Sequence, residues 1–286
     1  MGLLAVPDAV VRLALLILTI ASFIPQYRTT QERKNCDGVS LTYLLANIYI
    51  TNYMLAMIIA SMGPFSVEDY EQFFLGRSID LRDLYDLLQF AVPVFGFATH
   101  FYQTLTLPPK RPKVKFLAVV IRQFILLTTM LPAIGIVFTA DQWGQLVFML
   151  PLVYAHPIVL IAAILGPIRQ IFKMRHQPRP DELRALCPQG LLLQAPAFSL
   201  VGLSLLWRFY PGSWLWESHP EWRENNTIFV RIFVGLREWY RMTGWFTVDF
   251  LIIAFGQALV GYVAWKKQKQ KKATSADEEV ERQPLL

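Results

Sequence analysis

A few polar side chains interrupt long apolar stretches of this chain, and they are the residues whose chemistry a function would use. Asp249 and His156 are ionisable residues in two such stretches. Ionisable groups inside membrane segments are costly and mark solute pathways or proton relays. We therefore predict Asp249 as a proton-coupling carboxylate and His156 as a solute-binding residue. The amides in the apolar stretches are further solute-binding candidates: Asn47, Asn52, Gln194 and Gln257.

Each of these residues also has a structural interpretation. Asp249 would serve equally as an interfacial carboxylate in water or paired with Arg241. His156 would serve as a packed, hydrogen-bonded histidine. Buried amides in membranes most often form hydrogen bonds between helices. The sequence leaves these alternatives open.

The composition indicates that the apolar stretches cross a membrane. Hydrophobic residues make up 54% of the 286 residues and charged residues 17%, against about 45–50% and about 25% in soluble proteins. A net charge of +6 is compatible with nucleic-acid binding. However, the basic residues cluster beside apolar stretches, which is typical of membrane topology instead. Cys36 and Cys187 are the two cysteines, and no disulfide framework is expected.

Seven stretches have the length of a membrane-spanning helix, which is about 20 residues. A cleaved signal peptide is the alternative for the first stretch, but no clean cleavage site follows it. The fold class is therefore predicted as an all-α membrane protein with seven transmembrane helices. The predicted spans are Ala9–Tyr27, Leu41–Met62, Leu84–Leu107, Phe116–Thr139, Trp143–Ile171, Leu191 to Leu206 or Trp207, and Thr243–Trp265.

Lysine and arginine in the connections predict the orientation. Basic clusters follow the first, third, fifth and seventh spans, at residues 28–34, 110–115, 169–184 and 266–272. The connection at residues 63–83 is acidic, and the one at 208–242 is mixed. Since positive charge accumulates on the cytosolic side, the N-terminus is predicted to be lumenal and the C-terminus cytosolic.

The connection at residues 208–242 has two features of a lumenal segment. Asn225 begins an Asn-Asn-Thr sequence, which is a glycosylation acceptor. The segment is also rich in tryptophan and tyrosine, which anchor segments at the membrane interface. An aromatic lid over a solute entrance is the alternative interpretation of these rings.

A short proline motif occurs twice along the chain. The first span ends in Pro25-Gln26, and the fifth ends in Gly166-Pro167-Ile168. Each is followed by a basic turn and then by a glycine, Gly38 or Gly190. Proline removes a backbone donor, so each proline either marks a plain helix end or forms a hinge facing water. Two matched positions favour hinges and a parallel repeat, an architecture of transporters.

Residues 20–45 resemble the first repeat of PQ-loop proteins, through Pro25-Gln26, the basic turn and Gly38-x-Ser40-Leu41. This family includes lysosomal and vacuolar amino acid exporters and is related to the SWEET carriers. The resemblance implies two parallel three-helix bundles. The second repeat is degenerate, with Ile168 in place of the glutamine. The predicted units are residues 1–107 (first bundle), 108–141 (linker helix), 142–265 (second bundle) and 266–286 (disordered cytosolic tail).

The end of the tail resembles an acidic dileucine sorting signal. Glu281 is followed by Leu285 and Leu286, a pattern that sorting adaptors read in cytosolic tails. The basic block before it is predicted to contact anionic lipid. Together with the family resemblance, the signal favours a vacuolar or lysosomal membrane.

No enzyme signature is found in the sequence. It has no His/Cys ligand cluster, no glycine-rich phosphate loop and no Gly-x-Ser-x-Gly elbow, so no cofactor or metal is predicted. The leading hypothesis is a proton-coupled exporter of a small, polar, amino acid-like solute. The alternatives are a receptor or regulator that does not transport, and a membrane-embedded biosynthetic enzyme acting on a lipophilic substrate. Such an enzyme would need clustered carboxylates, for which the sequence offers Asp86 and Asp249.

Overall fold

The protein forms an all-α structure. The computed structural model describes residues 5–36, 38–60, 81–108, 112–139, 142–176, 186–208 and 244–281, and these residues contain helices and no strand. The helices are α1 (Ala5–Arg33), α2 (Leu41–Ala60), α3 (Leu81–Thr106), α4 (Pro112–Phe138), α5 (Gln142–His176), α6 (Pro188–Arg208) and α10 (Trp245–Glu281). They correspond one to one with the seven predicted spans.

Six of these helices are long and apolar enough to cross a membrane, and α3 is not among the six. With 26 residues, α3 has sufficient length, because an α-helix rises about 1.5 Å per residue. Its polar residues lower its hydropathy, and several of them are buried in the protein. The multi-pass membrane character predicted from composition is therefore supported by six described helices, with α3 packed among them.

The two motif prolines lie inside helices, which corrects the expectation that the helices end there. Pro25 is followed by eight more residues of α1, and Pro167 by nine more residues of α5. Because proline carries no N–H, the carbonyls of Ala21 and Ala163 receive no helical hydrogen bond from these positions. The helices continue past each proline into the polar turn that follows.

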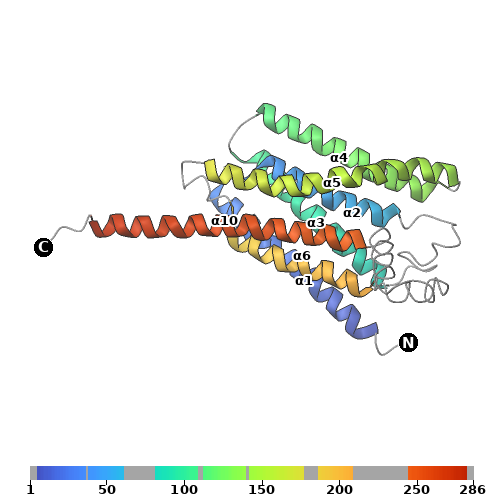
Figure 1. The fold of residues 1–286 in the computed structure, drawn as a ribbon, viewed down its shortest axis with the longest axis horizontal. Coiled ribbons are helices and arrows are strands. Elements are labelled where there is room, and N and C mark those ends of the chain that lie inside the picture. Colours follow the sequence, from blue (N-terminus) through green and yellow to red (C-terminus); the bar gives the residue numbers. More distant parts are fainter. Residues whose placement is uncertain are drawn as a thin grey trace, which may run out of the picture.

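The helix α10 also extends further than expected. It has 37 residues and continues to Glu281, whereas the sequence predicted a disordered tail from residue 266. Its far end projects beyond the other helices (Figure 1). Most residues over 266–281 are Lys, Gln, Ala or Glu, which are good helix formers, and this local preference explains why the helix does not stop at the last apolar residue.

The helices pack in a pattern that repeats along the chain. The helix α3 contacts both α1 and α2, and α10 contacts both α5 and α6. Across these groups, α1 packs against α6 and α2 against α5, while α4 lies against α2 and α5. The helices α1, α3, α5 and α10 run in one direction along the bundle (Figure 1). We refer to α1–α3 as the first triplet and to α5, α6 and α10 as the second triplet.

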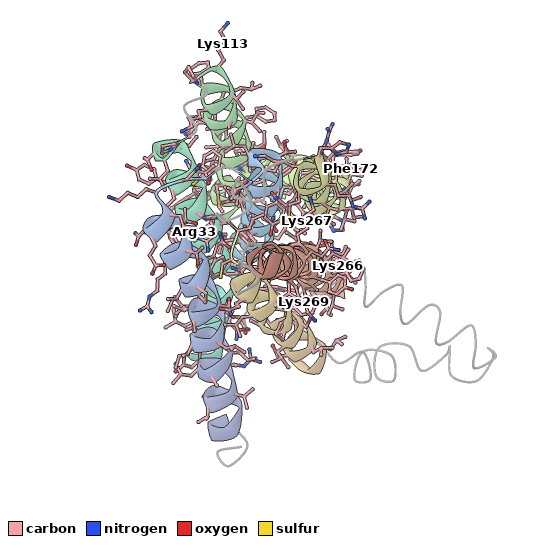
Figure 2. The ribbon with its side chains drawn as sticks, turned by 90° about the vertical axis from the view of Figure 1, so that its left-hand side faces the viewer. Arg33, Lys113, Phe172, Lys266, Lys267 and Lys269 are labelled. Atoms are coloured by element: carbon pink, nitrogen blue, oxygen red, sulfur yellow. The ribbon has the colours of Figure 1, made fainter. Side chains whose placement is uncertain are left out.

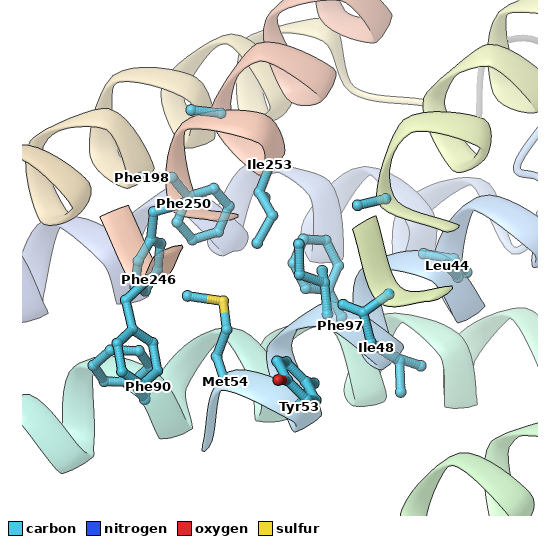
Figure 3. Packing of buried hydrophobic residues seen from close by; sticks show 14 of the residues in the cluster. Leu44, Ile48, Tyr53, Met54, Phe90, Phe97, Phe198, Phe246, Phe250 and Ile253 are labelled. Atoms are coloured by element: carbon cyan, nitrogen blue, oxygen red, sulfur yellow. The ribbon is translucent and has the colours of Figure 1, made fainter. Parts of the chain in front are cut away.

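Phenylalanine side chains fill the space where the two triplets meet. The ring of Phe90 on α3 lies 5.1 Å from that of Phe246 and 5.3 Å from that of Phe250, both on α10. The ring of Phe198 on α6 lies 6.2 Å from that of Phe97. All five rings are buried, and they are labelled in Figure 3 among the other packed apolar side chains. Buried aromatic rings therefore join α3 of the first triplet to α6 and α10 of the second.

Small residues permit close helix contacts. A Cβ atom added at Gly166 on α5 would lie 2.6 Å from the Cβ atom of Ala46 on α2. One added at Gly96 on α3 would lie 2.5 Å from the ring of Phe23 on α1. Close approach through small residues is the usual way in which membrane helices associate.

Basic side chains gather at one end of the bundle. Figure 2 looks onto this end, where Arg33 of α1, Lys113 of α4, and Lys266 and Lys269 of α10 are labelled. Lys173 near the end of α5 lies there as well, donating to the carbonyl of Val39 just before α2. We call this the basic end. Described residues from each of the four basic clusters that the sequence assigned to one side of the membrane therefore lie at this end.

Candidate functional site

The motif residue Gln26 connects α1 to the start of α6. Its side chain is buried, and its Oε1 atom accepts a hydrogen bond of 2.9 Å from the backbone N–H of Cys187. Its Nε2 atom lies 3.3 Å from Oγ1 of Thr30 and 3.5 Å from Nε2 of His100 on α3. The motif glutamine thus joins three helices at the basic end.

A second glutamine makes the matching connection from α5 to the start of α2. The Oε1 atom of Gln170 accepts a hydrogen bond of 2.6 Å from the backbone N–H of Ser40. Its Nε2 atom donates to the carbonyl of Gly38 at 2.6 Å. Gln170 is also fully buried.

Both glutamines bind the N-cap residue of the helix they face. The carbonyl of Ser40 accepts the first hydrogen bond of α2, from Leu44, and the carbonyl of Cys187 accepts the first hydrogen bond of α6, from Leu191. That is the definition of an N-cap position. Gln26 and Gln170 therefore hold equivalent places in the structure.

This equivalence corrects the interpretation of the second repeat. The glutamine is not lost to Ile168, because Gln170 makes the contacts that correspond to those of Gln26. What has changed is the proline, which stands three residues before the glutamine instead of one. The pairing of Gly38 with Gly190 also fails. Gly38 precedes α2 with a φ of 92°, whereas Gly190 lies inside α6.

Asp249 and His156 lie together near the opposite end of the bundle, an association that the sequence did not predict. The Oδ1 atom of Asp249 on α10 is 3.7 Å from Nε2 of His156 on α5. Asp249 is fully buried, and its carboxylate oxygens have no hydrogen-bond partner among the described residues. The ring of His156 stacks on Tyr53 at 5.5 Å and meets Trp245 edge-on at 5.4 Å. The predicted alternative partner, Arg241, lies outside the described residues.

Two of the predicted solute-binding amides hydrogen-bond to each other. Nε2 of Gln257 on α10 donates to Oδ1 of Asn47 on α2 at 3.1 Å, and Oε1 of Gln257 accepts from the hydroxyl of Tyr43. Asn47 in turn donates to the carbonyl of Tyr43 at 2.8 Å. All three side chains are buried. Here the structural interpretation applies, because the amides link α2 to α10.

The other two amides have one unpaired atom each. Asn52 donates to the carbonyl of Ile48 at 2.8 Å within α2, while its Oδ1 atom has no partner among the described residues. Oε1 of Gln194 on α6 likewise has no partner there. Both side chains are buried, so they keep polar atoms available inside the protein.

Sequence reasoning missed a buried ion pair near the same end as Asp249. Arg12 on α1 pairs with Asp86 on α3, and Gln89 lies 3.4 Å from the carbonyl of Arg12. Arg12 stands 14 residues before Gln26, and His156 stands 14 residues before Gln170. This equal spacing is the signal in the sequence that would have linked the two positions.

The remaining predicted sites cannot be placed. Asn225, Leu285 and Leu286 lie outside the described residues, and the side chain of Glu281 at the end of α10 is not described. Within the described ranges, no group of three His, Cys, Asp or Glu side chains has the arrangement of a metal site.

The described helices and the buried polar pairs define a multi-pass, all-α membrane protein. A family model described as PQ loop repeat matches residues 10–50, which cover most of α1 and the first half of α2. The chain therefore contains a PQ-loop repeat, as its Pro25-Gln26 motif predicted, and is consistent with a membrane protein of the PQ-loop family. No curated protein and no solved structure matches the chain.

Proposed function

We propose that this protein is a secondary transporter that exports a small, polar, amino acid-like solute from a vacuole or lysosome, driven by protons. The observation that carries the proposal is the matched pair of glutamines. Gln26 of the first triplet binds the start of α6, and Gln170 of the second triplet binds the start of α2. Two similar halves that face each other are the architecture of carriers built from parallel repeats.

The helix contacts support the same architecture. In each triplet the last helix packs between the other two, and the triplets meet through equivalent pairs of helices. We therefore infer that residues 1–107 and 142–265 are the two bundles, and that residues 108–141 supply the linker helix. The N-terminus is lumenal and the C-terminus cytosolic in this arrangement, which makes the basic end the cytosolic end.

In the proposed mechanism the protein alternates between openings at its two ends. Pro25 and Pro167 each interrupt helical hydrogen bonding before a bridging glutamine, and they serve as hinges. The buried phenylalanine rings pack between the two triplets. When one bundle moves against the other about these prolines, one end of the protein opens and the other closes.

Asp249 carries the proton in this proposal. A buried carboxylate 3.7 Å from a histidine is a group that can gain and lose a proton as its exposure to water changes. His156 is less buried than Asp249, with 20% of its side chain accessible against 0%, and in this proposal it passes the proton to and from the carboxylate.

The solute is proposed to bind between this pair and the polar residues deeper in the bundle. Asn52 and Gln194 supply unpaired oxygens, and Asn47 and Gln257 supply amides that exchange their mutual hydrogen bond for one to the solute. A solute with hydrogen-bond donors matches these oxygens. The enzyme alternative requires clustered carboxylates, and Asp86 and Asp249 instead lie beside different basic side chains, Arg12 and His156.

Location and orientation are testable separately. If residues 208–242 lie in the lumen, Asn225 is glycosylated, and glycosidase treatment increases the electrophoretic mobility of the protein. Asn225→Gln should give the same increase without the enzyme. If sorting adaptors bind the signal formed by Glu281, Leu285 and Leu286, the protein is directed to the vacuole or lysosome. Changing both leucines to alanine should then move the protein to the cell surface.

A thermal-shift screen of amino acid-like solutes on the purified protein tests the function. A ligand that binds the folded state stabilises it, and that ligand is then assayed for flux in proteoliposomes. Flux of the stabilising solute supports transport. A solute that stabilises the protein without crossing the membrane contradicts it and favours a receptor.

A further inference from the structure

The two buried glutamines connect opposite triplets at the same end of the protein. Gln26 belongs to the first triplet and its acceptor atom takes the N–H of Cys187, which starts α6 in the second. Gln170 belongs to the second triplet and bonds to Ser40 and Gly38, which lead into α2 in the first. We call these connections the glutamine bridges.

Each bridge satisfies a backbone group that would otherwise be buried and unpaired. The first N–H groups of a helix have no partner within the helix, and Ser40 and Cys187 are both buried. Leaving a buried donor without an acceptor costs more free energy than a hydrogen bond contributes, on balance, to stability. When the basic end opens, water can replace the glutamine oxygen at no such cost, so the bridges favour the closed state.

We propose that Gln26 and Gln170 together hold the basic end closed, and that Gln170 is the second-repeat counterpart of Gln26. Residues 10–50 match the family model, so Gln170 lies outside the matched segment, and three positions separate it from Pro167. The proposal deepens the proposed transport function, on which it rests, by naming the contacts that release the cytosolic end.

The bridges must break together if the triplets move as rigid units. Each crosses from one triplet to the other, in opposite senses, so any separation of the two triplets at this end stretches both. The hydrogen bond from Lys173 to the carbonyl of Val39, 2.6 Å long, lies beside the second bridge. Loss of either bridge should therefore loosen the whole end and not only the helix start that it caps.

The protein carries its own reporters of this opening. Cys36 and Cys187 are the two cysteines of the chain, and both are buried at the basic end. Cys187 donates the backbone N–H of the first bridge, and Cys36 lies just ahead of Gly38 in the second. Cys36→Ala and Cys187→Ala each leave one thiol, whose rate of maleimide labelling in lipid nanodiscs measures its exposure.

The decisive measurement is whether a change in one glutamine bridge alters the labelling of the cysteine beside the other bridge. In the Cys36→Ala background, Gln26→Leu should raise the labelling rate of Cys187 about tenfold, which is the population shift expected from one unsatisfied buried donor. Gln170→Leu, whose bridge is to α2, should raise Cys187 labelling by a similar factor. Gln31→Leu and Gln189→Leu, which change exposed glutamines at the same end, should leave the rate unchanged.

Two outcomes would overturn the proposal. One is unchanged labelling in both bridge variants. The other is a rise confined to the cysteine beside the altered glutamine, which would make each glutamine a local helix cap. Gln170→Met keeps the length of the side chain without its hydrogen-bonding atoms, so it is the variant to use if leucine prevents folding, and a rise at both thiols is expected. Maleimide labelling requires no solute, so it tests the bridges independently of transport. If the transport proposal alone fails, solute flux is absent while the bridge variants still raise the labelling rate.

Discussion

Nε2 of His156 lies 3.7 Å from Oδ1 of Asp249, and this contact has a counterpart in the other half of the protein. There Arg12 pairs with Asp86 across α1 and α3, at the same 14-residue distance from its bridging glutamine. The two pairs differ in chemistry. The basic partner is a guanidinium in the first pair, which does not release its proton in proteins, and an imidazole in the second, a group able to accept and release one. In our account the second pair therefore exchanges the proton, and the first pair is structural.

The structural role of the first pair predicts a specific pattern of stability. Arg12→Leu or Asp86→Leu alone should lower the free energy of unfolding by about 3–5 kcal/mol, because each leaves an uncompensated buried charge. The double variant should cost less than either single variant. Thermal unfolding of the purified protein in detergent measures both.

A matched control is available for this pattern. Arg28→Leu and Glu32→Leu change more exposed charges on the same helix as Arg12, and they should alter stability by less than about 1 kcal/mol. If the double variant costs the sum of the two single variants, the pair does not act as a unit.

The amide network between α2 and α10 predicts a coupling between two side chains. Tyr43→Phe and Gln257→Leu should each destabilise the protein, and a double-mutant cycle should give an interaction of about 0.6–2 kcal/mol, the range for hydrogen bonds between membrane helices. Tyr262→Phe, at an exposed tyrosine of α10, is the control. Additive effects of Tyr43→Phe and Gln257→Leu would contradict the hydrogen bond.

Close packing of α5 on α2 predicts a rescue. Gly166→Ala places a methyl group 2.6 Å from the Cβ atom of Ala46, and it should destabilise the protein by about 1–3 kcal/mol. Adding Ala46→Gly removes the opposing methyl and should recover most of that loss. Chemical denaturation of the two variants measures the difference, and a double variant less stable than Gly166→Ala would show that the helices do not meet there.

Much of the fold follows from the sequence, because apolar length and basic flanks report directly on membrane helices. The seven helices and the gathering of basic clusters at one end were predicted in this way. Helix ends are predicted less well. The Pro25 and Pro167 motifs are expected near the ends of the first and fifth spans, but a helix can continue past a proline when neighbouring helices support it, as α1 and α5 do here.

The candidate site was only partly predictable. Asp249 and His156 stand out because ionisable residues are rare in apolar segments, yet their contact depends on how α5 packs against α10. Gln170 does not follow a proline directly, so the Pro-Gln motif does not identify it. The position requires a side chain that reaches the N-cap residue of the facing helix. The distance in sequence from Pro167 does not show which residue does so.

Proton-coupled transport is tested by measuring flux of the solute through proteoliposomes with an acidic interior. We expect the imposed pH gradient to drive solute out of the vesicles that contain the wild-type protein. Asp249→Asn should still bind the solute but show no more gradient-driven flux than protein-free vesicles, while the exposed control Glu32→Gln behaves as the wild type. Flux that ignores the gradient, or an Asp249→Asn variant equal to the wild type, would contradict proton-coupled transport through this site.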